Sequence, residues 1–124
     1  MREIIKMIII IIILFISTPA IAFDKWDKTD IILLSASTVA LAIDWRQTRR
    51  IAEQPDRFFE INPILGRHPS LSQVDMYFMV SLIVNVGVAH ILPSKWRKIF
   101  LGAMTMWEVG FVTHNNNIGL GISW

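Results

Sequence analysis

The sequence predicts an all-α integral membrane bundle of three transmembrane helices, or four if the N-terminal signal segment is retained. Two features of the composition indicate this fold class. Hydrophobic residues make up 53% of the 124 residues and charged residues only 18%, against about 45–50% and about 25% in an average globular chain. The apolar residues also form continuous blocks, whereas the strands of a membrane β-barrel alternate. After the signal segment we expect one helical domain over residues 23–124.

Residues 1–22 have the order of a secretory signal peptide. Two basic residues, Arg2 and Lys6, precede an unbroken apolar stretch that is mostly isoleucine. Small residues then lead up to Ala22 in the spacing that signal peptidases recognise. We expect cleavage after Ala22, and the alternative is that the segment remains as an uncleaved anchor helix. In both cases the residues that follow lie outside the cytoplasm.

The apolar stretch Ile31–Ile43 predicts the first helix of the mature chain. Its 13 residues are fewer than the roughly 20 that a spanning helix needs. We therefore expect a longer helix over about Lys28–Glu53, with only its middle part in hydrocarbon. Asp27 or Thr29 would cap its start, and Trp45 with the arginines that follow it would lie at the headgroups.

The stretch Met76–Leu92 predicts the second helix. Two capping-box spacings precede it, Ser70-x-x-Gln73 and Ser72-x-x-Asp75, and a proline follows it directly. Its apolar residues run around the whole helix, which is typical of a helix in lipid or in a deep core. A chain of this size cannot bury three such helices from water, so soluble helical hairpins are the less favoured alternative.

The stretch Ile99–Thr113 predicts the third helix. Ser94 is the expected N-cap, and Trp96 would lie at the membrane interface. Three consecutive asparagines, beginning at Asn115, are expected to end the helix, because asparagine tolerates the left-handed conformation that stops helices.

The basic residues predict the orientation. Entry behind a signal segment makes the first mature helix run inward, so the Trp45–Leu71 loop lies in the cytoplasm. That loop contains five arginines, and the opposite loop, Pro93–Lys98, contains three basic residues, in agreement with the positive-inside rule. The expected location is the bacterial inner membrane, with the mature N-terminus periplasmic and the C-terminus cytoplasmic. Expected partners are the lipid bilayer and other membrane proteins or further copies of the chain. Nucleic acid is not expected, because no long basic run is present.

Polar residues within the apolar stretches are the candidates for a functional site. Glu108 is flanked on both sides by apolar residues, and an ionisable group at membrane depth needs a partner or a proton. Asp44, Gln47 and Thr48 share one helix face by their spacing. We expect these groups to gather toward the cytoplasmic half of the bundle. The candidate catalytic residues are Glu108, Asp44, Glu60 and His114, and the candidate binding residues are Gln47, Thr48, Asn62, His68 and Asn115.

These residue types fit two kinds of chemistry. Carboxylates with a histidine could hold a divalent metal through oxygen and nitrogen ligands, or act as acid and base near a lipid headgroup. No zinc-protease, P-loop, nucleophile-elbow or dinucleotide motif is present, and the absence of cysteine excludes thiolate chemistry. A structural role is the alternative for each position, for example a helix end at His114 or a paired carboxyl at Glu108.

Three motifs follow one another along the chain: Asp44-x-x-Gln47-Thr48, then Glu60-Ile61-Asn62-Pro63-Ile64-Leu65-Gly66-x-His68-Pro69-Ser70, and finally Glu108 with His114-Asn115. With this pattern the chain resembles a family of short bacterial membrane proteins, over about residues 44–121. No activity is assigned to that family. The resemblance therefore implies a fold type and a set of positions, and no function.

Two function classes are the main interpretations of the sequence, and a third, a transporter, would require several copies, because one protomer has too few helices to form a pathway. The first is a structural, interaction or modulatory protein of the inner membrane, which the small size and the lack of a catalytic motif favour. The alternative is a small membrane-embedded enzyme or metal-binding protein with a carboxylate and histidine cluster at the cytoplasmic headgroup level. Convergence of Asp44, Glu60, Glu108 and His114 in space would favour the alternative.

Overall fold

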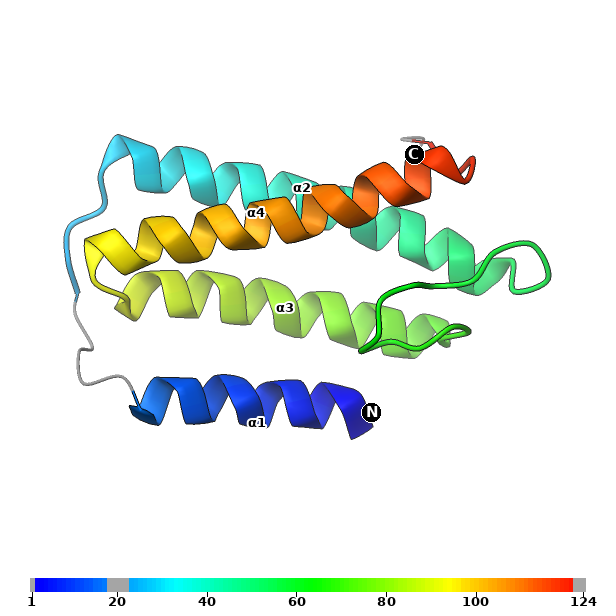
Figure 1. The fold of residues 1–124 in the computed structure, drawn as a ribbon, viewed down its shortest axis with the longest axis horizontal. Coiled ribbons are helices and arrows are strands. Elements are labelled where there is room, and N and C mark those ends of the chain that lie inside the picture. Colours follow the sequence, from blue (N-terminus) through cyan, green and yellow to red (C-terminus); the bar gives the residue numbers. More distant parts are fainter. Residues whose placement is uncertain (1, 18–22, 122–124) are drawn as a thin grey trace.

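The computed structural model describes residues 2–17 and 23–121, and within these ranges every regular element is an α-helix and no strand is present. The predicted all-α fold class is therefore confirmed. The expected cleavage site at Ala22 lies outside the described residues. Successive helices run in opposite directions along one common axis (Figure 1). In chain order they are α1 (Arg2–Ser17), α2 (Lys28–Glu53), α3 (Leu71–Ile91) and α4 (Ser94–Asn117).

Helix α2 has the bounds that the sequence predicts, and a complete capping box starts it. The Asp27 carboxylate accepts a hydrogen bond of 2.9 Å from the Asp30 amide, and the Asp30 carboxylate accepts one of 2.9 Å from the Asp27 amide. Each side chain thus satisfies an amide that the first helical turn leaves without a partner. Of the two predicted caps, Asp27 is the correct one and Thr29 lies inside the helix.

Helix α3 begins earlier than its apolar stretch, because the capping box of Ser70 and Gln73 forms as predicted. The Ser70 hydroxyl accepts a hydrogen bond of 3.2 Å from the Gln73 amide, and the Gln73 side chain accepts one of 2.9 Å from the Ser70 amide. The second predicted spacing, from Ser72, falls within the helix. Among the described helices, α3 alone is long and apolar enough to cross a membrane by length and composition.

Helix α4 ends within the predicted asparagines, but its N-cap and its left-handed residue differ from the prediction. Pro93 occupies the N-cap position, and Ser94 is the first helical residue, whose hydroxyl accepts a hydrogen bond of 3.0 Å from Lys98 Nζ instead of capping the helix. The three asparagines continue the helix to Asn117, and the left-handed conformation falls on Gly119, with a φ of 98°. Glycine adopts that conformation without the Cβ clash that asparagine meets.

The helices enclose two apolar clusters. The larger one contains Leu41 of α2 with Val74, Tyr77 and Phe78 of α3, and Ile4 of α1 packs onto it. The smaller one joins the end of α2, the loop between α2 and α3 and the C-terminal turn. The loop of residues 54–70 and the C-terminal end of the described chain lie at the same end of the bundle (Figure 1). That end, here called the loop end, contains the candidate site.

Candidate functional site

Facing sides of α2 and α4 carry a buried polar cluster at the loop end of the bundle. Asp44, Gln47 and Thr48 are all buried on one face of α2, as their spacing predicts. Glu108 and Asn115 lie two turns apart on α4, and both are also buried. Since α2 and α4 pack directly against each other, these two polar faces meet inside the bundle.

The Asp44 carboxylate is the centre of this cluster. Its Oδ1 atom accepts hydrogen bonds from the Asn115 amide at 2.9 Å and from the Thr48 hydroxyl at 3.3 Å. The buried carboxyl group of Glu108 lies near Asp44, on the facing helix. Two negative charges buried side by side are unfavourable unless a proton or a cation compensates one of them.

The loop between α2 and α3 adds a third carboxyl group to the cluster. Glu60 is buried, and its Oε1 atom accepts a hydrogen bond of 2.8 Å from the Asn62 amide. The Glu60 amide in turn donates to the Arg67 carbonyl at 2.8 Å. These bonds hold the Glu60 side chain in the interior of the loop end, where its Oε2 atom has no hydrogen-bond donor.

Two aromatic residues complete the surroundings. Tyr77, the one tyrosine of the chain, is buried on α3 near the side chains of Asn62, Trp107 and Glu108. Neither aromatic residue is among the positions that the sequence predicts. The single tyrosine in an apolar stretch was the available signal, because a buried tyrosine hydroxyl usually has a polar partner.

The C-terminal turn covers the cluster from the side of α2. Gln47 donates a hydrogen bond of 2.8 Å to the Gly121 carbonyl, and Arg50 donates one of 3.0 Å to the Leu120 carbonyl. Leu120 also packs with Phe58 of the loop and Ile51 of α2. The turn and the loop together therefore close the loop end of the bundle over the carboxyl groups.

Four buried oxygen atoms of the cluster have no hydrogen-bond donor: Gln47 Oε1, Glu60 Oε2, Glu108 Oε2 and Asn115 Oδ1. Within residues 2–17 and 23–121, every ion pair lies elsewhere, and none includes Asp44, Glu60 or Glu108. Burying a carboxylate without compensation is costly. The arrangement is therefore suited to a ligand that is positively charged or rich in hydrogen-bond donors.

The two histidines of the predicted site do not join this cluster. His68 is exposed on the loop and His114 is only partly buried on α4, and no contact among the described residues joins either imidazole to the carboxyl groups. Among all the residues that the structure describes, no three acidic or imidazole side chains are arranged to hold a metal ion. The predicted set thus divides into a buried group of carboxyl, amide and hydroxyl side chains and two separate imidazoles.

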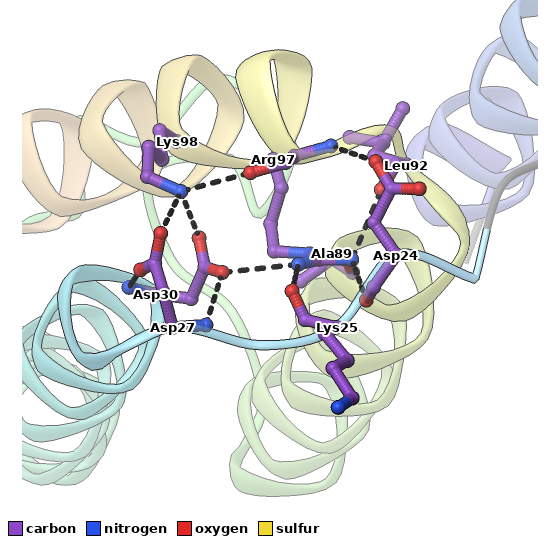
Figure 2. A network of polar contacts seen from close by, with 9 residues as sticks. Asp24, Lys25, Asp27, Asp30, Ala89, Leu92, Arg97 and Lys98 are labelled. Atoms are coloured by element: carbon purple, nitrogen blue, oxygen red, sulfur yellow. Dashed lines mark hydrogen bonds and ion pairs between the residues drawn. The ribbon is translucent and has the colours of Figure 1, made fainter.

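A second polar network lies at the opposite end of the bundle, around Arg97 (Figure 2). The buried Arg97 guanidinium forms an ion pair of 3.0 Å with the buried Asp30 carboxylate. It also stacks over the Trp26 ring at 4.8 Å. Its remaining hydrogen bonds go to backbone carbonyls, those of Ala89 at 2.7 Å, Lys25 at 3.3 Å, Asp24 at 2.9 Å and Leu92 at 3.2 Å.

Lys98 extends this network along the first turn of α4. It pairs with Asp27 at 2.8 Å and with Asp30 at 2.9 Å. The hydrogen bond from Lys98, together with that from the Asp30 amide, lowers the pKa of Asp27 below its ordinary value of 3.8. The charges of Arg97 and Lys98 are thus paired with those of Asp27 and Asp30, in contrast to the carboxyl groups at the loop end. We interpret the Arg97 network as an anchor for the segment before α2.

No protein-family model matches the chain, and no curated protein or solved structure is significantly similar to it. The family resemblance in the motifs therefore stays a prediction. The fold and the site together define the class of protein as an all-helical bundle with a buried acidic site lined by oxygen atoms.

Proposed function

We propose that the protein is a small polytopic inner-membrane protein that binds an alkali cation in the carboxyl cluster. One observation carries this proposal. The buried carboxyl groups of Asp44 and Glu108 lie on facing helices without an ion-pair partner among the described residues, and the buried oxygens Glu108 Oε2, Gln47 Oε1 and Asn115 Oδ1 have no hydrogen-bond donor. A cation would compensate the charge and accept these oxygens as ligands.

The chemistry of the cluster favours a hard monovalent cation. Its potential ligands are carboxylate, amide and hydroxyl oxygens, which suit hard cations, whereas imidazole and thiolate ligands suit zinc or copper. Among the described residues no three acidic or imidazole side chains are arranged to hold a metal ion, so the amide oxygens of Gln47 and Asn115 would have to complete the ligands that Asp44 and Glu108 supply. A divalent metal, which the donor set suggests in the sequence, is the alternative occupant of the same oxygens.

Outward-facing apolar side chains support residence in a membrane. Helix α3 is a candidate span by length and composition. Met106 of α4 is 77% exposed and Ile83 of α3 is 67% exposed, and Ile31, Ile32 and Val39 of α2 are exposed as well. Apolar surface of this extent is typical of contact with lipid or with other proteins. We therefore propose three spans, formed by α2, α3 and α4.

We place the loop end in the cytoplasm because entry behind an N-terminal signal segment would make the first mature helix run inward. The basic residues do not decide this orientation. The loop end carries five arginines between Trp45 and Leu71, and the opposite end carries five basic residues at positions 25, 28, 95, 97 and 98, whereas the positive-inside rule needs an excess on one side. The mature N-terminus would then be periplasmic and the C-terminus cytoplasmic.

Thermal unfolding of the purified protein in detergent micelles tests cation binding. We expect one of lithium, sodium or potassium chloride to raise the Tm saturably above the value in choline chloride at equal ionic strength, because a ligand that binds only the folded state stabilises it. Asp44→Asn and Glu108→Gln should lose this shift. Glu53→Gln, which removes an exposed carboxylate from the same helix α2, should keep it. Equal Tm values in all four salts would contradict the proposal.

A role in membrane interactions is the second candidate. It is favoured by an open apolar groove of about 460 Å³ between α2 and α4, whose walls include Ala36, Val39, Thr105 and Val109. Small and branched residues allow close approach of another transmembrane helix. If the groove holds a helix of a second copy, Ala36→Phe should reduce cross-linking between copies in membranes, whereas Val86→Phe on exposed α3 surface should not.

A further inference from the structure

The apolar groove between α2 and α4 runs lengthwise along the bundle. Its wall on α2 extends from Ser35 to Ile43, and its wall on α4 extends from Thr105 to Val112. At about 1.5 Å per residue the α2 wall is about 12 Å long, which is close to half of the roughly 30 Å thickness of the hydrocarbon core. The volume of about 460 Å³ lies within the range of about 300–1,000 Å³ that is common for ligand pockets. The groove therefore has the dimensions of a site for one lipid chain from one leaflet.

The walls of the groove offer an occupant no free hydroxyl hydrogen. Two of the lining residues carry a hydroxyl group, and both hydroxyls donate to a carbonyl of their own helix. Ser35 donates a hydrogen bond of 2.7 Å to the Ile31 carbonyl, and Thr105 donates one of 2.8 Å to the Leu101 carbonyl. The other lining residues are alanine, valine and isoleucine. An occupant of this length of groove must therefore be apolar.

A cationic group stands beyond the loop end of the groove. Arg46 follows Val39 by seven residues and Ile43 by three, so it lies on the same face of α2, nearer the loop end. Its Nε atom is buried and has no hydrogen-bond acceptor, and Arg46 belongs to no ion pair among the described residues. A buried donor without an acceptor is costly. The end of the groove thus requires an acceptor that the described residues do not supply.

An apolar channel with an arginine at one end matches an amphiphile with a phosphate group. The planar guanidinium donates to phosphate oxygens in a bidentate geometry, and arginine side chains extend along apolar surface to reach the headgroups. We propose that the groove binds the acyl chain of a glycerophospholipid whose phosphate accepts hydrogen bonds from Arg46. The inference takes residence in the membrane from the proposed function and does not involve the carboxyl cluster. A helix of a second copy, which would leave Arg46 without a phosphate, is the occupant that the experiment has to distinguish.

Thermal unfolding of the full chain in detergent micelles tests the lipid site. We expect phosphatidylglycerol to raise the Tm saturably, because a ligand that binds only the folded state stabilises it. Two compounds divide this ligand into its parts. Diacylglycerol with the same chains lacks the phosphate, and glycerol phosphate lacks the chains. Neither should reproduce the shift at the same concentration, since the groove and the arginine act on different parts of one molecule.

Four variants assign the shift to the groove and to Arg46. Arg46→Gln should weaken the affinity for phosphatidylglycerol by about tenfold or more, the loss expected for a hydrogen bond to a charged group. Arg57→Gln removes one positive charge from exposed surface at the same end and should keep the affinity. Ala36→Phe fills the groove and should abolish the shift, whereas Val86→Phe on exposed α3 surface should retain it. The Tm of each variant without lipid shows whether it folds, and native mass spectrometry counts the lipid molecules that it retains.

Three results would overturn the lipid site and leave the proposed function standing. A wild-type Tm that does not respond to phosphatidylglycerol would show that the groove holds no lipid. Equal affinities for Arg46→Gln and Arg57→Gln would reduce the effect to general surface charge. Unchanged lipid binding in Ala36→Phe, with loss of cross-linking between copies, would assign the groove to a second copy. The alkali effect on Tm is measured without added lipid, so its absence would reject cation binding and leave the lipid site intact.

Discussion

The Asn115 side chain of α4 donates a hydrogen bond of 2.9 Å to the Asp44 carboxylate of α2, with both residues buried. This bond connects the two helices at the point where the unpaired carboxyl groups gather. It uses the donor of the Asn115 amide and leaves the amide oxygen free of partners. Asn115 therefore orients Asp44 and at the same time presents an oxygen to a ligand.

Replacing Asn115 tests this double role. Asn115→Ala should lower the free energy of unfolding by about 1–3 kcal/mol, because the buried Asp44 loses a hydrogen bond. It should also weaken the alkali-dependent Tm shift. Asn116→Ala, on the exposed side of the same turn, should change neither quantity. Chemical unfolding in detergent micelles measures the first effect, and equal losses for the two variants would contradict the role of Asn115.

Arg97 should be the most sensitive position at the opposite end. Arg97→Ala leaves the buried Asp30 without its ion-pair partner and several carbonyls without a donor, and breaking a buried pair costs about 3–5 kcal/mol. Arg97→Lys should also destabilise strongly, because an ammonium cannot reproduce the planar set of donors. Lys95→Ala, an exposed change in the same turn, is the control. A Tm for Arg97→Lys close to that of the wild type would be evidence against the anchor.

Apolar periodicity and capping predicted the helices well, because both are local properties. The bounds of α2 and the Ser70–Gln73 capping box are correct. The end of α4 falls at Asn117, within the predicted asparagines, but the left-handed conformation belongs to Gly119. The hydrogen bond from Asn115 to Asp44 could not be predicted, because the two residues are 71 positions apart in the sequence. Long-range pairs of this kind leave no mark on a single sequence.

The candidate site was predictable in part for the same reason. Helical spacing placed Asp44, Gln47 and Thr48 on one face correctly, whereas spacing says nothing about which way a loop turns. Glu60 faces the interior but His68 in the same loop is exposed. The pairing of Asp30 with Arg97 was missed because it joins residues 67 positions apart. Arg97 was instead counted with the basic residues of an exposed loop.

Acid should weaken the anchor through Asp27. The pKa of Asp27 is lowered in the folded protein, so Asp27 stabilises the fold at pH values above its ordinary pKa of 3.8. This stabilisation is lost as the pH falls through the lower pKa of the folded state. When the pH is reduced from neutral to below 3.8, the Tm of the wild type should therefore fall further than the Tm of Asp27→Asn. Parallel pH profiles for the two proteins would show that the contact with Lys98 contributes nothing.

The proposed orientation can be measured directly, because the chain has no cysteine of its own. Gln54→Cys places a thiol at the end of α2, next to the loop, and Lys95→Cys places one on exposed surface at the opposite end. A membrane-impermeant maleimide is added to spheroplasts whose inner membrane is intact, and Lys95→Cys should react there. Gln54→Cys should react only after permeabilisation, because the loop end is expected in the cytoplasm. The reverse pattern would invert the bundle and put the carboxyl cluster on the periplasmic side. Reaction of both thiols in intact cells would contradict the three spans themselves.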